Sequence, residues 1–142
     1  HEALFPVLEE LNVGFVAFSP MANGLLTACY GKDDKFDPKL DYRSAMPQFT
    51  PEAADQNRAL LELLRDLAER KHATPAQISL SWMLCKKPYI VPIPGSRKVE
   101  RMRENAGAAE VVLSPAEVAT LDRILETVPM SAVFGGTAVK SR

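Results

Sequence analysis

Two short, continuous apolar runs constrain the fold of this sequence more than any other feature. The first reads Val-Gly-Phe-Val-Ala-Phe at residues 13–18, and the second lies at residues 89–93, where Ile90, Val91 and Ile93 stand among prolines. Runs of this length without polar alternation are typical of parallel strands that are buried on both faces. Two such strands cannot cover each other, and a two-stranded sheet is marginal alone. The pattern therefore predicts a part of a larger barrel or sheet.

Helices are predicted for most of the remaining chain. Three helix starts share a hydroxyl residue followed by proline, because the hydroxyl caps free N–H groups and proline fits the first turn. The pairs are Thr50-Pro51, Thr74-Pro75 and Ser114-Pro115. They predict helices at 51–71, 75–86 and 115–127, in addition to an amphipathic helix at 2–11 and a basic helix that ends near residue 107. This order predicts an α/β fold in which helical crossovers join parallel strands.

Residues 1–142 are expected to form a single segment with two irregular parts. The stretch at 29–50 has no clean period and carries scattered aromatic residues, so it is either a lid over a site or a surface excursion. The tail at 129–142 is small and Gly-rich, and we expect it to be flexible.

Composition argues against several classes of partner. The formal net charge of −1 gives no reason to expect binding to nucleic acid or to an acidic membrane. No apolar run approaches the roughly 20 residues that span a bilayer. Cys29 and Cys85 show no metal spacing and have no neighbouring His, so we expect free packing thiols, no metal site and a cytoplasmic location.

Both strands lead into loops that carry Gly and Ser, at residues 19–24 and 95–101. Ligands of parallel α/β folds bind beyond the carboxyl ends of the strands, so these two loops are the candidate site. In eight-stranded barrels, the loops after strands 7 and 8 commonly bind phosphate.

The second loop opens a helix whose first turns carry the wrong charge. Helix N-termini favour acidic residues, yet this one is crowded by Arg97, Lys98, Arg101 and Arg103. A bound phosphate would explain both the geometry and the charge. The alternative is a solvated basic helix with Ser96 as its N-cap and with Glu100 and Glu104 as intrahelical partners.

Three blocks of the sequence resemble the aldo-keto reductase family. They lie at 13–21 with 24–27, at 74–82, and at 91–97 with Glu104 and Asn105, in the family's order and spacing. The resemblance implies a (β/α)8 TIM barrel that reduces aldehydes and ketones with NADPH. The chain is similar to its C-terminal portion, strands 7 and 8 with their helices, and would hold the barrel only in part.

The resemblance also implies a cofactor site. The loop after the first strand would cradle the pyrophosphate with Ser19, Met21, Asn23 and Leu25. The turn and helix after the second strand would hold the 2′-phosphate and adenine with Gly95, Ser96, Arg97, Arg101, Glu104 and Asn105, which favours NADPH over NADH. Ala22 and Ala28 stand where the family commonly has glycine, and this matters at Ala22 if that position needs a positive φ.

No residue here matches the family's catalytic Asp, Tyr, Lys and His, so we assign no catalytic residue. We therefore expect an oxidoreductase segment, whether fragment or complete product, that binds NADP(H) for a small carbonyl substrate. The alternative is a non-catalytic half-barrel, or a regulatory nucleotide-binding or assembly protein. Open strand edges also predict self-association or pairing with a chain that supplies the missing strands.

Overall fold

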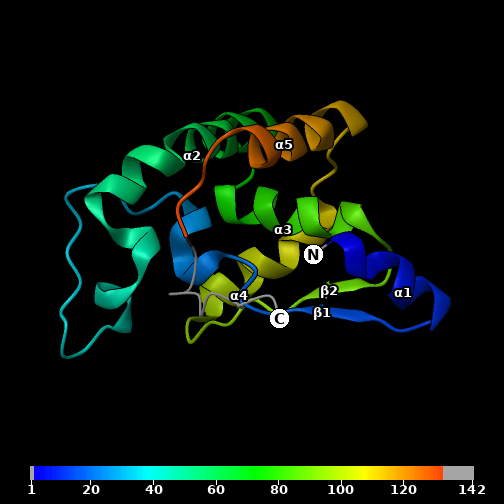
Figure 1. The fold of residues 1–142 in the computed structure, drawn as a ribbon, viewed down its shortest axis with the longest axis horizontal. Helices are drawn as coiled ribbons and strands as arrows, with labels where there is room; N and C mark the ends of the chain where they lie inside the picture. Colours follow the sequence, from blue (N-terminus) through cyan, green and yellow to red (C-terminus); the bar gives the residue numbers. More distant parts are fainter. Residues whose placement is uncertain (1, 133–142) are drawn as a thin grey trace, which may run out of the picture.

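A computed structural model describes residues 2–132 of the chain. Its helices and strands follow one another in the predicted order (Figure 1). The α-helices are α1 (Phe5–Glu10), α2 (Pro51–Lys71), α3 (Pro75–Lys86), α4 (Val99–Ala106) and α5 (Pro115–Thr127), and the strands are β1 (Phe15–Ala17) and β2 (Ile90–Pro92). Short 3₁₀ turns are η1 (Glu2–Leu4), η2 (Ala22–Thr27), η3 (Tyr42–Ala45), η4 (Pro47–Phe49) and η5 (Gly107–Glu110).

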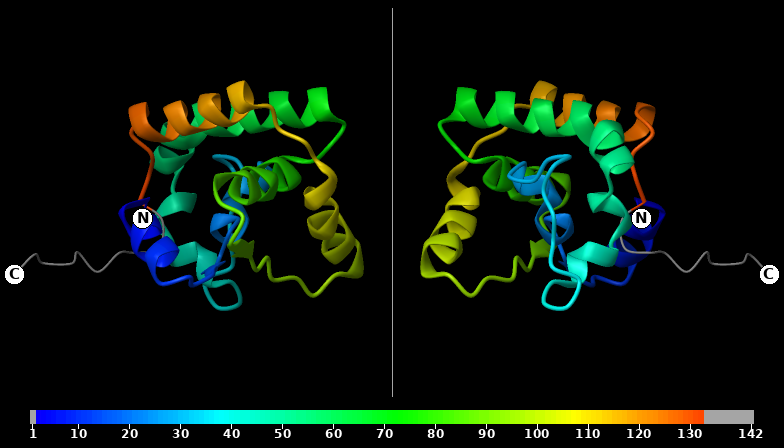
Figure 2. Two further views of the ribbon diagram at one scale, coloured as in Figure 1. Left: turned by 90° about the vertical axis from the view of Figure 1, so that its right-hand side faces the viewer. Right: turned by 90° about the vertical axis from the view of Figure 1, so that its left-hand side faces the viewer.

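The two strands pair in parallel, which confirms the prediction. Phe15 lies opposite Ile90 and Ala17 lies opposite Pro92, and α2 and α3 form the connection between the strands. Helix α3 packs on β2, and α2 and α5 lie side by side above α3 (Figures 1 and 2). The result is a layered α/β unit in which one face of a small sheet is covered by helices.

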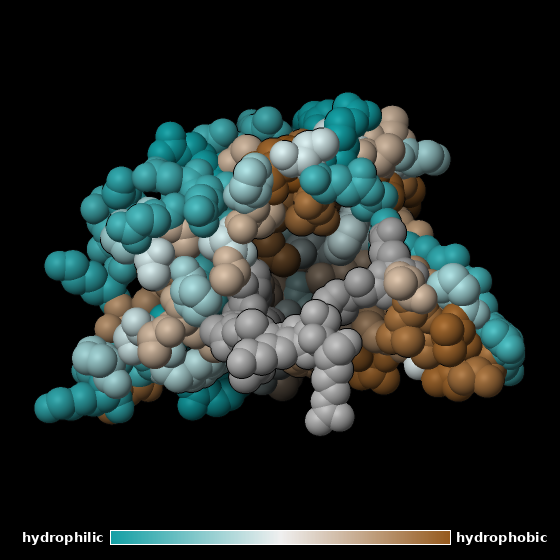
Figure 3. All heavy atoms as spheres, viewed as in Figure 1, coloured by the Kyte–Doolittle hydropathy of each residue, from teal (hydrophilic) through white to brown (hydrophobic). Residues whose placement is uncertain are grey.

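Burial of the strands on both faces, which the apolar runs predicted, is wrong for this chain. Ile90 is buried, but the next pair in the register, Val16 and Val91, is exposed, at 59% and 56%. Hydrophobic surface also gathers where α1 and β1 lie, at the lower right of Figure 3. One face of the sheet therefore has no cover within the described residues, although its composition is that of a buried face.

The hydrophobic core lies between the helices. The apolar face of α2, with Leu64 and Leu67, packs against Ile78 of α3 and Leu121 of α5. On α5, Ile124 packs against this core, whereas Leu125 is exposed.

Trp82 packs against this core but is only partly buried, and its indole Nε1 donates a hydrogen bond to Asp122 at 2.8 Å. Helix α1 buries none of its residues, and the turn η1 replaces the first part of the helix expected at 2–11.

All three predicted caps are present. The Thr50 hydroxyl accepts a hydrogen bond from the backbone N–H of Ala53. Thr74 and Ser114 form capping boxes with residues three positions later, as their spacing predicted. In the second box, Glu117 also forms an ion pair with Lys71 of α2, with an N–O distance of 2.8 Å.

This ion pair predicts a loss of stability in acid. The pKa of Glu117 is lowered from 4.5 to about 2, first by the hydrogen bond from Lys71 and then by the backbone N–H of Ser114. A depressed folded-state pKa gives stability that is present above pH 4.5 and is lost as the pH falls toward 2. Because the pair is near the surface, we expect the group to contribute about 1–2 kcal/mol to the free energy of unfolding.

Urea unfolding at pH 6 and pH 3 would measure this contribution. Glu117→Gln should lower the free energy of unfolding at pH 6 and should narrow its difference between the two pH values. Glu126→Gln, an exposed change on the same helix, is the matched control. If the free energy of unfolding of Glu117→Gln changed with pH as much as that of the original protein, the acid sensitivity would not come from Glu117.

The segment after α5 folds back against α2. Ser131 is buried, its backbone N–H donates to the side-chain oxygen of Asn57, and the Asn57 amide donates to its hydroxyl at 2.8 Å. The rest of the tail that was expected to be flexible, residues 133–142, lies outside the described residues. Within residues 2–132, no helix combines the length and apolar composition that a membrane span requires.

Candidate functional site

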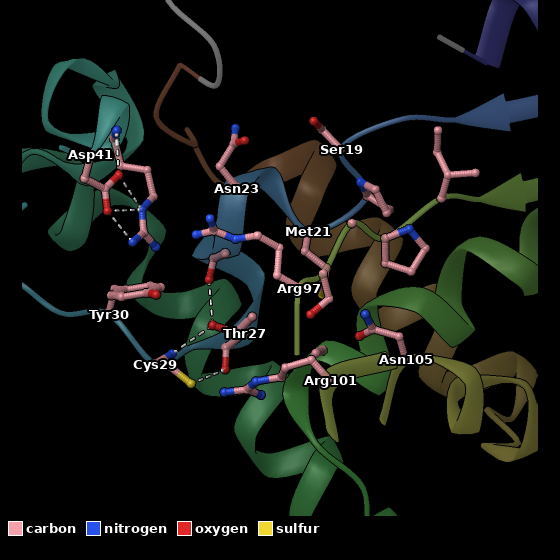
Figure 4. A pocket seen from close by; sticks show the side chains of 18 of the residues that line it. Ser19, Met21, Asn23, Thr27, Cys29, Tyr30, Asp41, Arg97, Arg101 and Asn105 are labelled. Atoms are coloured by element: carbon pink, nitrogen blue, oxygen red, sulfur yellow. Dashed lines mark hydrogen bonds and ion pairs between the residues drawn. The ribbon is translucent and has the colours of Figure 1, made fainter. Parts of the chain in front are cut away.

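A cavity of about 800 Å³ lies where the two strand exits meet. Most of the predicted site residues line it: Ser19, Met21, Asn23, Gly95, Ser96, Arg97, Arg101 and Asn105. In Figure 4, Ser19 and Asn23 lie on one side of the hollow, Arg101 and Asn105 lie on the other, and Arg97 lies between them. Two further predicted residues do not line the cavity, since Leu25 is buried in the core and Glu104 contacts Thr74.

The loop after β1 is built from strained backbone. Ser19, Ala22 and Asn23 have φ values of 47°, 47° and 58°, and Gly24 has a φ of 103°. Left-handed conformations of this kind are costly for residues with a Cβ, and they persist where the surrounding structure enforces them, often at functional sites. The Thr27 hydroxyl braces the turn by donating to the Gly24 carbonyl at 2.6 Å.

The two alanines that differ from the resembled pattern both lie at left-handed positions. Ala22 has a φ of 47° and Ala28 has a φ of 55°. The family's glycine at these positions is therefore the residue that the backbone conformation favours, and alanine is strained there.

Replacing Ala22 with glycine should stabilise the chain by about 1 kcal/mol, since glycine removes the left-handed penalty. Thermal or urea unfolding would measure the change. Ala59→Gly, at an exposed position within α2, should instead destabilise by about 1 kcal/mol. If Ala22→Gly and Ala59→Gly destabilise the protein equally, the left-handed backbone at Ala22 does not cost measurable stability.

The loop after β2 offers space and positive charge. A Cβ added to Gly95 would meet no atom within 4 Å. The Ser96 hydroxyl accepts a hydrogen bond from the backbone N–H of Lys98, at 3.1 Å. Lys98 occupies the N-cap position of α4, so Ser96 does not cap the helix as the alternative of a solvated basic helix assumed.

Arg97 and Arg101, the two cavity arginines that follow β2, differ in their partners. Arg101 forms an ion pair with Glu104 at 2.8 Å, and this hydrogen bond is the main reason that the pKa of Arg101 is raised. No carboxylate of the described residues forms an ion pair with Arg97. Of these two guanidinium groups, that of Arg101 is already anchored and the charge of Arg97 is uncompensated.

The irregular segment adds a wall that sequence reasoning did not assign to the site. Leu40, Asp41, Tyr42 and Arg43 line the cavity, and the Tyr42 hydroxyl donates to the Asn23 side-chain oxygen at 2.9 Å. The signal in the sequence was the aromatic content of 29–50, which suggested a lid without indicating which residues would face the site.

This wall is held by Arg43. Its guanidinium bonds both carboxylate oxygens of Asp41, at 2.9 and 2.5 Å, and lies 4.8 and 4.3 Å from the ring centroids of Tyr30 and Phe36. The guanidinium also holds the pKa of Asp41 below its ordinary value. A bidentate pair stacked on two rings makes the segment ordered at this point rather than a loose excursion.

The groups around the cavity fit a ligand that carries phosphate. The side-chain nitrogen of Asn23 is buried and has no hydrogen-bond partner among the described residues. A buried donor of this kind calls for a partner. Together with the uncompensated Arg97 and the open space at Gly95, it offers a donor, a cation and room at one place.

Other candidate chemistry is weaker. Cys29 lines the cavity and Cys85 lies elsewhere, and both thiols are free and exposed rather than packed as predicted. Among the described residues, His, Cys, Asp and Glu side chains nowhere gather in a group of three that could hold a metal ion.

Comparison with known proteins gives the family. The model of the aldo/keto reductase family matches residues 1–126. The chain is 36% identical over 124 residues to aldo-keto reductase str7 of Strobilurus tenacellus, a match that covers 87% of this chain and 37% of that protein. It is 35% identical over 137 residues to a probable aldo-keto reductase 1 of Glycine max, covering 95% of this chain and 38% of the relative.

Solved structures agree with this match. A thermostable aldo-keto reductase, Tm1743, in complex with the inhibitor epalrestat, superposes with a TM-score of 0.57 at 29% identity, over 85% of this chain and 33% of that one. A glycerol dehydrogenase from Gluconobacter oxydans shares the fold with a TM-score of 0.77 at 23% identity, over 92% of this chain and 39% of that one. The chain spans only 33% to 39% of the length of these proteins. It belongs to the aldo/keto reductase family, and its α/β fold corresponds to part of the family's barrel structures.

Proposed function

We propose that the chain forms the C-terminal portion of an aldo-keto reductase barrel and holds NADP(H) for the reduction of aldehydes and ketones. In this proposal, β1 and β2 are strands 7 and 8 of the barrel. The observation that carries it is the meeting of two Gly- and Ser-containing strand exits with Arg97 and Arg101 around one cavity. Barrels of this class commonly bind phosphate with the loops that follow these two strands.

Each side of the cavity has a distinct part in this proposal. Ser19, Met21 and Asn23 bind the pyrophosphate, and Leu25 supports their loop from the core beneath it. On the other side, Gly95 gives the ligand close access to the backbone. In this proposal, the 2′-phosphate and adenine are held by Ser96, Arg97, Arg101, Glu104 and Asn105.

The chain's own residues bind and orient the cofactor. When bound, NADPH supplies a hydride to the carbonyl carbon of the substrate. A proton donor for the developing alkoxide belongs to strands that this chain does not match, either in the same polypeptide or in a partner. The side chains of Val16 and Val91, which are exposed here, lie on the sheet face that such strands would help to bury.

That exposed sheet face also favours a second candidate function. A half-barrel that binds nucleotide and pairs with another chain, without turnover, would use the same apolar surface. The reductase and the non-catalytic half-barrel can be told apart by activity. Only the reductase, assembled with its missing strands, would consume an aldehyde when NADPH is supplied.

A titration of the purified protein with NADPH tests the proposal. Nicotinamide fluorescence should change saturably, and adenosine 2′,5′-bisphosphate should compete whereas AMP should compete weakly. Light scattering on the same sample gives the mass, and aldehyde-dependent oxidation of NADPH separates the two candidate functions. Absence of a saturable fluorescence change would overturn cofactor binding in both.

A further inference from the structure

The chain leaves the loop after β1 and enters the irregular segment 29–50 at Ala28. Thr27 and Cys29, on either side of it, both line the cavity (Figure 4). Ala28 has a φ of 55° and ends the turn η2 as its left-handed C-cap. The backbone conformation of Ala28 therefore decides how the segment that forms the cavity wall faces the loop after β1.

Alanine is a poor residue for this conformation. A left-handed backbone is costly for a residue with a Cβ, whereas glycine adopts it freely. Ala28 stands where the resembled family commonly has glycine. Another contact is therefore needed to favour the left-handed backbone in this chain.

Arg65 of α2 makes such a contact. Its guanidinium Nη2 donates a hydrogen bond to the Ala28 backbone carbonyl at 2.7 Å. A charged donor forms a stronger hydrogen bond than a neutral one. The direction of this carbonyl depends on the backbone angles of Ala28, so the hydrogen bond favours the left-handed conformation.

The helix that carries Arg65 is firmly held. Leu64, the preceding residue, is 2% exposed and belongs to the core that α2 shares with α3 and α5. A second link joins the segment to α2, between Lys32 and Asp55 at 3.2 Å. Both of these side chains are exposed, and such surface pairs contribute little. Arg65 is therefore the better anchor for the start of the segment.

We propose that Arg65 is a positioning residue that offsets the left-handed strain of Ala28 and thereby holds the segment 29–50 in place as a wall of the cavity. It acts from outside the cavity, which it does not line. Losing the guanidinium removes a contact that favours the left-handed backbone, and placing glycine at position 28 removes the strain that the contact offsets. The two changes are therefore expected to cancel.

Cleavage of the whole protein by a lysine-specific protease, without any ligand, tests this inference. The segment has exposed lysines at Lys32, Lys35 and Lys39, and Arg65→Met leaves the set of lysines unchanged. This variant keeps the apolar stem but loses the donor. Cleavage within the segment should become about fivefold faster, because it follows the population in which the segment is open. Arg65→Met combined with Ala28→Gly should return to about the original rate.

Two controls separate this local effect from general destabilisation. Arg70→Met removes an exposed arginine of the same helix whose guanidinium bonds a carbonyl of α2 itself, that of Asp66, so cleavage within the segment should not change. Ala22→Gly relieves the same kind of strain earlier in the loop, so in the Arg65→Met background it should leave the fast cleavage as it is.

Three results would overturn the inference. Cleavage of Arg65→Met at the original rate would show that the guanidinium does not hold the segment. Rescue by Ala22→Gly as complete as that by Ala28→Gly would show that Arg65 acts on overall stability. Failure of Ala28→Gly to slow the cleavage would show that the strain at Ala28 is not what Arg65 offsets.

This test is independent of the proposed function, because the cleavage rates are measured without NADPH. A protein that gives no saturable fluorescence change with NADPH would lack the proposed cofactor site. Its cleavage rates would still decide whether Arg65 positions the cavity wall.

Discussion

Arg97→Ala should weaken NADPH binding by about ten- to a hundredfold, because a hydrogen bond to a charged group contributes about 1.5–3 kcal/mol. NADH binding should change less than about threefold, since NADH lacks the 2′-phosphate. Arg97 lines the cavity and no described carboxylate pairs with it, so its removal leaves no buried partner behind. Arg101→Ala should show the same selectivity with a smaller loss, about tenfold, because Arg101 is shared with Glu104.

Fluorescence titration with both cofactors measures this selectivity. Lys98→Ala is the matched control, because it removes a neighbouring positive charge that does not line the cavity. It should lower both affinities slightly and should leave their ratio unchanged. Equal losses for NADPH and NADH in Arg97→Ala would show that the arginine does not contact a 2′-phosphate.

The second large effect is expected at the other strand exit. Gly24→Ala should destabilise the protein by about 2 kcal/mol, because the backbone there has a φ of 103° and the new Cβ would lie 3.1 Å from Cε2 of Tyr30. Tyr30 cannot yield freely, since its ring stacks with Arg43 and packs against Phe49. The loop that binds the pyrophosphate in our proposal would therefore change shape.

The affinities for the two cofactors distinguish Gly24→Ala from Arg97→Ala. The pyrophosphate is common to both cofactors, so Gly24→Ala should weaken NADPH and NADH to the same extent, unlike Arg97→Ala. Gly31→Ala is the matched control, because its nearest neighbour would be 3.8 Å away and its φ is not positive. Urea unfolding and the two titrations measure the effects. A stable Gly24→Ala protein with unchanged affinities would contradict the assigned strain.

Local chemistry explains why much of the fold could be predicted. A hydroxyl followed by proline specifies a helix start through contacts within four residues, and α2, α3 and α5 begin where Thr50, Thr74 and Ser114 predicted. The parallel pairing of the strands followed from their apolar runs and helical connection. The exposure of Val16 could not be predicted in the same way, since an apolar run does not encode which elements pack against it.

At the candidate site, too, features set by nearby residues could be predicted and contacts between distant residues could not. The two strand exits were found from Gly, Ser and Arg residues close together in sequence, and they do meet at one cavity. Contacts between distant residues were missed, because no local pattern encodes that Tyr42 reaches Asn23 or that Thr74 holds Glu104. The left-handed backbone at Ala22 was raised only as a condition, since alanine gives no signal for a positive φ.

The pairing of Asn57 with Ser131 sets the smallest part of this chain that can fold well. A protein cut after α5, at residue 128, would keep every helix and strand of the described fold but would leave the Asn57 amide buried without its partner. An unsatisfied buried polar group costs about 1–3 kcal/mol, which is a large share of the stability of a small domain. The packed part of this chain therefore extends past the last helix, and boundaries drawn from secondary structure alone would fall a few residues short.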